Sequence, residues 1–302
     1  MKFLVTGGAG FIGKHIIAEL LRDDHNITIF DNFSSSSKND IVHLLENGVS
    51  LVTGDILDYD LLLKSMSNYD FVIHLAAQTS ISQSIAEPKT TAGIIVDGTV
   101  NVLKCCVKTN VKGIVFSSSA AVYGDSLDTP ISETSQPNPV SPYGASKLVA
   151  EYNLQAFSKF FGLNCISLRL FNVYGGDKSS KMDVVRKFLK NISEGLPLEI
   201  FGDGKQTRDF VHILDVIQAI YCAIKNIEAK RGDIYNIGSG NSTSINELAL
   251  LLISSKGKDL QIIHKPSIEG EIKYSKADIS LAETDIGYSP KVSLRNGLAN
   301  LD

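Results

Sequence analysis

Short apolar runs alternate with helix-like segments along roughly the first half of the chain. Each run is partly β-branched, and most of them end at a glycine, a serine or a charged residue, which is typical of buried parallel strands. Between the runs, apolar residues recur at helical spacing, as they do from Ile12 to Leu21. The predicted strands are Lys2–Thr6, Ile27–Phe30, Ser50–Thr53, Phe71–His74, Gly113–Ser117 and Cys165–Leu170, and the clearest helices are Gly98–Lys108 and Ser146–Phe161.

This alternation predicts βαβ units, and hence an α/β fold of the Rossmann type, with a doubly wound parallel sheet and helices on both faces. After Gly175 the elements become shorter and alternate with glycine, proline and charged loops. We therefore expect a smaller mixed α/β C-terminal substrate domain, with helices at Asp183–Ser193 and Ile245–Ser254. The predicted division is 1–174 for the nucleotide-binding domain with the catalytic residues and 175–302 mainly for substrate, with some segments returning to the first domain.

A glycine-rich turn joins the first predicted strand to the first helix. Gly7, Gly10 and Gly13 have GxxGxxG spacing, which is wider than the usual GxGxxG. Backbone N–H groups of such a turn converge on a pyrophosphate at the helix N-terminus, although a glycine triplet alone is equally a tight turn. Asp31 closes the second strand, where a carboxylate accepts hydrogen bonds from ribose hydroxyls and repels a 2′-phosphate. The complete strand–helix–strand–acid unit favours NAD over NADP.

Composition narrows the function classes. The 302 residues are 43% hydrophobic and 21% charged, with a net charge of −4, as in an ordinary soluble globular protein. Nothing in this charge favours nucleic acid or an anionic membrane surface. No uninterrupted apolar run approaches the roughly 18 residues of a transmembrane helix, and Met1 leads directly into a strand, so we expect a cytoplasmic protein without a membrane partner.

Metal chemistry is also not expected. The cysteines form no CxxC pair and lie in apolar periodic segments, and the histidines lack ligand spacing. We expect buried, reduced thiols at Cys105, Cys106, Cys165 and Cys222.

Two polar motifs carry candidate chemistry. Tyr143 and Lys147 are spaced i, i+4, so on a helix they share one face, where an ammonium favours the phenolate. Such a pair can take a proton from a hydroxyl while a hydride leaves the same carbon. Upstream, Ser117–Ser119 ends a predicted strand. Alone, the first motif is also a solvated helix face and the second a strand terminus or cap. Within a nucleotide-binding fold, the combination favours a hydroxyl beside Tyr143.

These motifs together resemble the extended short-chain dehydrogenase/reductases, in the NAD-dependent nucleotide-sugar epimerase and dehydratase family, and within it the UDP-glucose 4-epimerases. The resemblance runs nearly from end to end. The matching segments are Thr6–Gly13, Gly54–Asp58, His74–Ala77, Ser117–Gly124, Tyr143 with Lys147, Arg169–Gly175, Gly202–His212 and Tyr235–Gly238.

The resemblance implies a catalytic set of Ser119, Tyr143 and Lys147, in which Lys147 also binds the nicotinamide ribose. It implies that Asp31 holds the adenine ribose, that Asp55 and Ile56 flank the adenine, and that Ala76 and Ala77 line the nicotinamide. The full set of expected NAD-binding residues is Gly7, Gly10, Phe11, Ile12, Gly13, Asp31, Asn32, Asp55, Ile56, Ala76, Ala77 and Lys147.

For the substrate, the resemblance implies that Asn172 and Arg208 contact the diphosphate of a UDP-sugar. Phe201 is either a platform for the uracil or a core aromatic. Ser275 takes the place of a gate beside the sugar C2 substituent, and its small size leads us to expect N-acetylhexosamine substrates as well. Homodimers of the family pair two helices that correspond to Gly98–Lys108 and Ser146–Phe161, so a homodimer is expected.

The reaction implied is NAD-dependent 4-epimerisation of UDP-glucose and UDP-galactose through a transient 4-keto sugar. Dehydratases of the family carry an Asp-Glu pair after the catalytic hydroxyl, where this chain has Ala120 and Ala121, which cannot move a proton. The alternatives are a UDP-uronate epimerase or decarboxylase, a 4-keto nucleotide-sugar reductase, and a non-catalytic dinucleotide sensor. Two departures from the family pattern are Ile268 in place of an arginine that clamps the diphosphate, and Ile95 in place of an asparagine.

Overall fold

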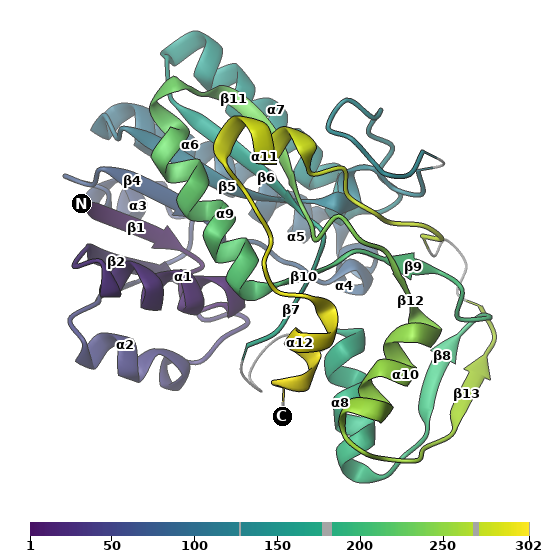
Figure 1. Ribbon diagram of the computed structural model, residues 1–302. Helices are drawn as coiled ribbons and strands as arrows, with labels where there is room; N and C mark the ends of the chain where they lie inside the picture. Colours follow the sequence, from purple (N-terminus) through teal and green to yellow (C-terminus); the bar gives the residue numbers. More distant parts are fainter. Residues whose placement is uncertain (127, 177–182, 268–271, 302) are drawn as a thin grey trace.

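A seven-stranded sheet, parallel throughout, forms the larger part of the molecule in the computed structural model (Figure 1). The structure describes residues 1–126, 128–176, 183–267 and 272–301. The strand order is β11-β6-β5-β4-β1-β2-β3. The strands are β1 (Lys2–Thr6), β2 (Asn26–Asp31), β3 (Ser50–Thr53), β4 (Phe71–His74), β5 (Gly113–Ser119), β6 (Cys165–Leu170) and β11 (Arg231–Ile237).

Helices cover both faces of this sheet. On one face α1 (Phe11–Arg22), α2 (Val42–Glu46) and α9 (Ile213–Asn226) close one apolar core. On the other face α3 (Tyr59–Ser65), α6 (Gly98–Thr109) and α7 (Pro142–Phe161) close a second. The predicted Rossmann-type doubly wound sheet is therefore confirmed, and the strand order reverses between β1 and β4, where ligands bind in such folds.

Most predicted strands have the expected bounds, but α7 begins earlier than its apolar periodicity predicts. The Ser141 side chain accepts a hydrogen bond from the Gly144 N–H at 3.1 Å, and Pro142 occupies the first helical turn, where a missing N–H costs nothing. Tyr143 consequently lies in the first turn of α7. Strand β5 also continues through Ser119, two residues beyond its predicted end.

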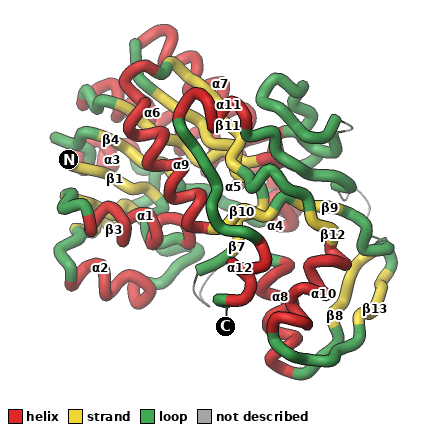
Figure 2. Tube along the Cα trace, in the orientation of Figure 1, coloured by secondary structure: helices red, strands yellow, loops and turns green. Residues whose placement is uncertain are grey.

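A smaller layer of mixed elements packs beside the carboxyl ends of the strands (Figures 1 and 2). Its own apolar core joins α8 (Val184–Glu194), β8 (Leu198–Phe201), α10 (Ile245–Ser255), β13 (Ile262–Lys265) and α12 (Leu294–Ala299). Two short pairs link it to the sheet, namely β7 (Asn172–Tyr174) with β10 (Phe210–His212) and β9 (Thr207–Arg208) with β12 (Thr243–Ser244). In the C-terminal half of the chain, α9, β11 and α11 (Ser280–Ile286) pack on the large sheet instead.

The remaining helical segments are short. They are η1 (Lys38–Ile41), η3 (Ala120–Val122), η4 (Ile227–Ala229), α4 (Ile81–Ala86), α5 (Pro88–Ala92) and the π-helical turn η2 (Gly93–Asp97). Of the cysteines, Cys105, Cys106 and Cys165 are buried as expected, whereas Cys222 is only half-buried.

One helical stretch corrects the expectation that no segment approaches a membrane span. Across α5, η2 and α6, the stretch Pro88–Thr109 is long and apolar enough to cross a bilayer by length and composition. The expectation considered uninterrupted apolar runs, whereas the mean hydropathy of a whole helix can be high even when a few charged residues interrupt those runs. The core helix of a soluble protein meets the same criterion, and 44% of the apolar window is buried inside the protein. The stretch is thus weak evidence for a membrane span, and the cytoplasmic location stays a prediction.

Candidate active site

The glycine-rich loop fits closely against the end of β4. Gly7 has a φ of +68°, and a Cβ there would lie 2.6 Å from the Ala76 backbone nitrogen. A Cβ on Gly13 would lie 2.6 Å from the Gly7 carbonyl oxygen. Only glycine fits these two positions, so the loop, the start of α1 and the Ala76–Ala77 segment pack together where the strand order reverses.

The N-terminus of α1 is open to an anion. Gly10 is its N-cap residue and provides no side-chain cap for the N–H groups of the first turn, which begins with Phe11 and Ile12. A helix N-terminus with free N–H groups and no Cβ in the way is suited to a pyrophosphate. These residues therefore fit the phosphates of a dinucleotide.

The acidic residues expected near the adenosine lie on neighbouring strand ends. The Asp31 carboxylate is buried and accepts the Ala9 N–H at 3.0 Å and the Phe33 N–H at 2.8 Å, which fixes its direction. Asn32 donates from Nδ2 to the Asp55 carboxylate at 2.8 Å.

Ile56, expected to flank the adenine, has its side chain in the core. It packs against Gly98 of α6 so tightly that a Cβ on Gly98 would lie 2.4 Å from Ile56 Cδ1. The Ile56 carbonyl oxygen accepts a hydrogen bond from Asn101 Nδ2 at 3.1 Å.

The predicted catalytic residues come together at the end of β5. The Ser119 hydroxyl hydrogen-bonds to the Tyr143 hydroxyl, and it also accepts the Ala121 N–H at 3.2 Å. One turn further along α7, the Lys147 ammonium donates to the Ser117 carbonyl oxygen at 2.6 Å. Both the tyrosine and the lysine are buried. The end of β5 and the first turns of α7 thus bring together a hydroxyl donor, a phenol and an ammonium.

Electrostatics at Tyr143 differ from the prediction that the nearby ammonium favours the phenolate. Burial raises the pKa of Tyr143, and the hydrogen bond from Ser119 opposes this only in part. Burial likewise lowers the pKa of Lys147 to about 7. The prediction was wrong for the protein alone, because Lys147 Nζ is directed to a carbonyl and lies 6.0 Å from the centre of the Tyr143 ring.

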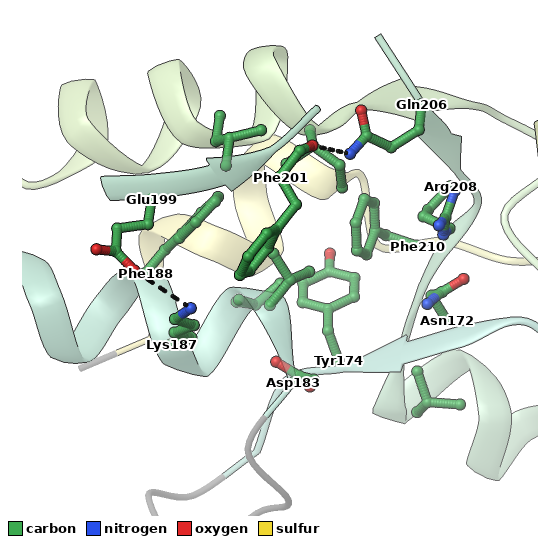
Figure 3. Close-up of a pocket in the computed structure, with 15 residues that line it drawn as sticks. Asn172, Tyr174, Asp183, Lys187, Phe188, Glu199, Phe201, Gln206, Arg208 and Phe210 are labelled. Atoms are coloured by element: carbon green, nitrogen blue, oxygen red, sulfur yellow. Dashed lines mark hydrogen bonds and ion pairs between the residues drawn. The ribbon is translucent and has the colours of Figure 1, made fainter. Parts of the chain in front are cut away.

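A cavity of about 440 Å³ between α8, β8 and β7 contains three of the four predicted substrate residues. Asn172 on β7, Phe201 at the end of β8 and Arg208 on β9 line it. In Figure 3, Asn172 and Arg208 lie at one end and Phe201 lies between them and Lys187. Phe201 is 36% exposed, with Lys187 Nζ 5.2 Å above its ring, so it is a wall of the cavity and not a core aromatic.

Ser275 is not among the residues that line this cavity. It is buried on a segment that runs between β9 and the loop after η3. The segment is held before Ser275 by Lys273, whose N–H donates to Asp125 at 2.9 Å and whose carbonyl accepts the Thr207 N–H at 2.9 Å. After Ser275, Ala277 pairs with Ile131.

Asp209 is a site-supporting residue that the sequence analysis missed. Its buried carboxylate accepts the N–H groups of Ser239 at 2.6 Å, Gly240 at 3.0 Å and Ala277 at 3.1 Å, and also the Ser239 hydroxyl at 2.7 Å. Burial raises the pKa of Asp209, and these hydrogen bonds oppose that rise. The only signal in the sequence was its place beside Arg208 in the matched segment Gly202–His212.

Of the two departures from the family pattern, Ile95 and Ile268, the structure describes only Ile95. Ile95 lies in η2 with its side chain in the core beneath α7, and its carbonyl accepts the Thr99 hydroxyl. An apolar residue is therefore compatible with that position. Ile268 lies outside the described residues. Lys265, a cation three residues earlier in the sequence, is paired with the Glu199 carboxylate at 3.4 Å.

Comparison with known proteins identifies the family. Residues 3–238 match the model of the NAD dependent epimerase/dehydratase family. The chain belongs to this family. A curated relative from Methanocaldococcus jannaschii, described as a putative UDP-glucose 4-epimerase, is 37% identical to this chain. The alignment covers 98% of this chain and 95% of the relative.

Solved structures agree with this membership. The UDP-glucose 4-epimerase of Thermotoga maritima, solved with UDP-glucose, is 34% identical with a TM-score of 0.93, covering 99% of this chain and 96% of its own. The UDP-glucuronic acid 4-epimerase of Bacillus cereus, solved with UDP-glucuronic acid and NAD, is 34% identical with a TM-score of 0.92, at 99% and 96% coverage. The predicted extended short-chain dehydrogenase/reductase family and its cofactor NAD are therefore confirmed, and the protein is an NAD-dependent nucleotide-sugar epimerase of this family.

Proposed function

We propose that this enzyme interconverts UDP-glucose and UDP-galactose, and their N-acetyl forms, by epimerisation at C4. The main support for the proposal is that Ser119, Tyr143 and Lys147 come together in the structure. In the sequence, two alanines directly follow Ser119. The three polar groups suit proton transfer at a sugar hydroxyl. Ala120 and Ala121 form the start of η3 and offer no acid or base for eliminating water.

Proton transfer in the proposed mechanism belongs to Tyr143. As the phenolate it takes the proton of the C4 hydroxyl, while Ser119 hydrogen-bonds to the reacting oxygen. Bound NAD would supply the hydride acceptor at C4 and, after reduction, the hydride donor for the return step. Tyr143 gives its proton back after the 4-keto sugar has turned about the diphosphate, so that the opposite face is reduced. In its charged form Lys147 contributes to stabilising the phenolate, in addition to the positive nicotinamide of bound NAD.

Turning the sugar requires a firm hold on the nucleotide and a loose hold on the hexose. The cavity is compatible with such a division, because Asn172, Gln206 and Arg208 lie at one end, Lys187 and Glu199 lie at the other, and Phe201 lies between them. We propose that Arg208 and Asn172 bind the diphosphate and that Phe201 packs against the base. Arg208 is suited to this because its guanidinium stays charged and donates in a fork.

A UDP-uronate 4-epimerase is the second candidate. The Bacillus cereus structure with UDP-glucuronic acid is as similar to this chain as the Thermotoga maritima structure with UDP-glucose. The segment that we assign to the sugar C6, Thr79–Ser84, carries hydroxyls but no Arg or Lys. Within it, the half-buried Ser80 and the exposed Ser82 hydrogen-bond to each other at 3.0 Å. Hydroxyls bind a carboxylate less strongly than a cation does, so we favour the neutral hexoses.

Product analysis on a panel of sugars tests the proposal. The purified protein is incubated with UDP-glucose, UDP-galactose and their N-acetyl and uronate counterparts, with and without added NAD. We expect interconversion of the neutral 4-epimer pairs without net formation of NADH. Turnover of the uronate pair alone would establish the second candidate. No turnover of any pair, even with NAD, would contradict both and favour a reductase or a dinucleotide sensor.

A further inference from the structure

The three consecutive serines that end β5 contact three residues of α7 that are spaced one turn apart. The hydroxyl of the last serine in Ser117–Ser119 bonds Tyr143, and the carbonyl of the first accepts the Lys147 ammonium at 2.6 Å. The hydroxyl of the middle serine donates to the Glu151 carboxylate. The mechanism uses the first two of these α7 residues, and the third is so far without a function.

Glu151 belongs to a buried polar network. Its side chain is fully buried and paired with Arg169 of β6, with Nε to Oε1 at 3.0 Å and Nη2 to Oε2 at 2.7 Å. Arg169 also donates to the Tyr123 hydroxyl at 2.8 Å. A buried ion pair is costly to desolvate, and a pair of apolar residues would stabilise the fold at least as well. Stability alone therefore does not account for the charge at this position.

We propose that Glu151 is a positioning residue that keeps Lys147 charged beneath Tyr143, with Ser118 and Arg169 holding the carboxylate in place. The geometry supports this, because Lys147 and Glu151 lie one turn apart on the same face of α7 and are both buried. The role rests on the proposed function, since it concerns the same Tyr143–Lys147 pair.

Among the charged groups near Lys147, Glu151 is the one that opposes the lowering of the Lys147 pKa by burial. Burial lowers the pKa of Lys147 to about 7, and Glu151 raises it. His74 faces it from β4, but burial lowers the pKa of this histidine to about 3, so the ring is neutral near neutral pH. Arg169 on β6 is engaged by Glu151 and Tyr123. From β5, the Ser117 carbonyl accepts the ammonium and the Phe116 ring lies with its centre 4.6 Å from Nζ, but neither group carries a net charge.

A direct titration of Lys147 tests the proposal without any substrate. Lysine side chains are isotope-labelled in the full-length protein, and the ε-carbon signal of Lys147 is assigned by its loss in Lys147→Met. We expect Glu151→Gln to lower the titration midpoint of Lys147 by roughly one pH unit or more. Glu151→Asp, which keeps the charge, should leave the midpoint near that of the wild type. A folded Glu151→Gln protein with the wild-type midpoint would overturn the proposal.

Glu151→Gln leaves Arg169 buried without its carboxylate and can prevent folding. The double variant Glu151→Gln/Arg169→Gln removes both charges and avoids this problem. A lowered Lys147 midpoint in the folded double variant supports the proposal, and an unchanged midpoint contradicts it.

The pH profile of turnover provides a second measurement. If Glu151 acts through Lys147, the alkaline limb of kcat/KM should move to lower pH in Glu151→Gln and stay in place in Glu151→Asp. A loss of equal size at every pH would indicate a merely structural role and overturn the proposal. If the wild type turned over none of the sugars, the proposed function would fail, while the NMR titration would still decide the role of Glu151.

Discussion

Tyr143 holds its hydroxyl in a buried setting, between a serine that donates to it and a lysine that faces its ring. Its replacement by phenylalanine removes the proton carrier without opening a cavity. We expect Tyr143→Phe to lower kcat about 10²- to 10⁴-fold, while NAD and UDP-sugar still bind. Single-turnover kinetics and equilibrium binding check both parts. Unchanged turnover would instead indicate that another residue moves the proton, and a dinucleotide sensor would be indifferent to the change in every assay.

The ionisation of Tyr143 gives a prediction with a definite sign. Burial raises its pKa, so in the protein without dinucleotide the phenolate should form only above a pH of about 10. Because Lys147 has a pKa of about 7, its charge is also lost as the pH rises through that value, which removes help for the phenolate. Binding of oxidised NAD, whose nicotinamide is positive, should move the Tyr143 titration downward.

The difference in phenolate ultraviolet absorbance between the wild type and Tyr143→Phe measures this titration, with and without NAD. Phenolate at neutral pH in the NAD-free protein would contradict the direction of the shift. Lys147→Met serves as the matched comparison, because with NAD present its Tyr143 titration should lie above that of the wild type by the part of the shift that the ammonium contributes.

At the scale of elements, the segment that carries Ser275 is held from both sides. Lys273 bonds Asp125 before it, and Ala277 bonds Asp209 after it. A segment so fixed cannot withdraw from a bulkier side chain. We therefore predict that Ser275→Tyr abolishes turnover of UDP-N-acetylglucosamine and spares UDP-glucose.

Comparison of kcat/KM for the two sugars checks this prediction, with Ser275→Ala as the control that adds no volume. An equal loss for both sugars would contradict a gate at this position. Since Ser275 lies outside the set that lines the cavity around Arg208, such a loss would indicate that the segment supports the fold only.

At the scale of the whole molecule, α7 carries exposed apolar side chains on one face, among the residues that the structure describes. Its inner face packs on the sheet, whereas Val149 is 43% exposed and Tyr152 is 55% exposed on the outer face. We predict that this face pairs with its copy in a homodimer, together with α6. Light scattering after gel filtration should give a dimer for the wild type and for Tyr152→Phe, and a monomer for Tyr152→Glu. A monomeric wild type would contradict the prediction.

Local patterns predicted much of the architecture. The strands from β1 to β6 could be located because each is a short, largely apolar run, and the glycine spacing marked the loop before α1. Strand β11 was missed as a member of the large sheet, because its polar residues interrupt the apolar run. The start of α7 was missed because capping by Ser141, and not apolar periodicity, determines it. The two-domain division stays a prediction.

The sequence by itself determined the chemistry that is available: a phenol and an ammonium one turn apart, a nearby row of hydroxyls, a glycine loop with a terminal acid, and two alanines where elimination would need acids. These properties depend on residue type and short spacing. Only the tertiary structure decided which serine meets Tyr143, that Asn172, Phe201 and Arg208 share one cavity, and that Glu151 pairs with Arg169 beside Lys147. It also decided the direction of the Tyr143 pKa, because burial depends on what the rest of the chain packs around the hydroxyl.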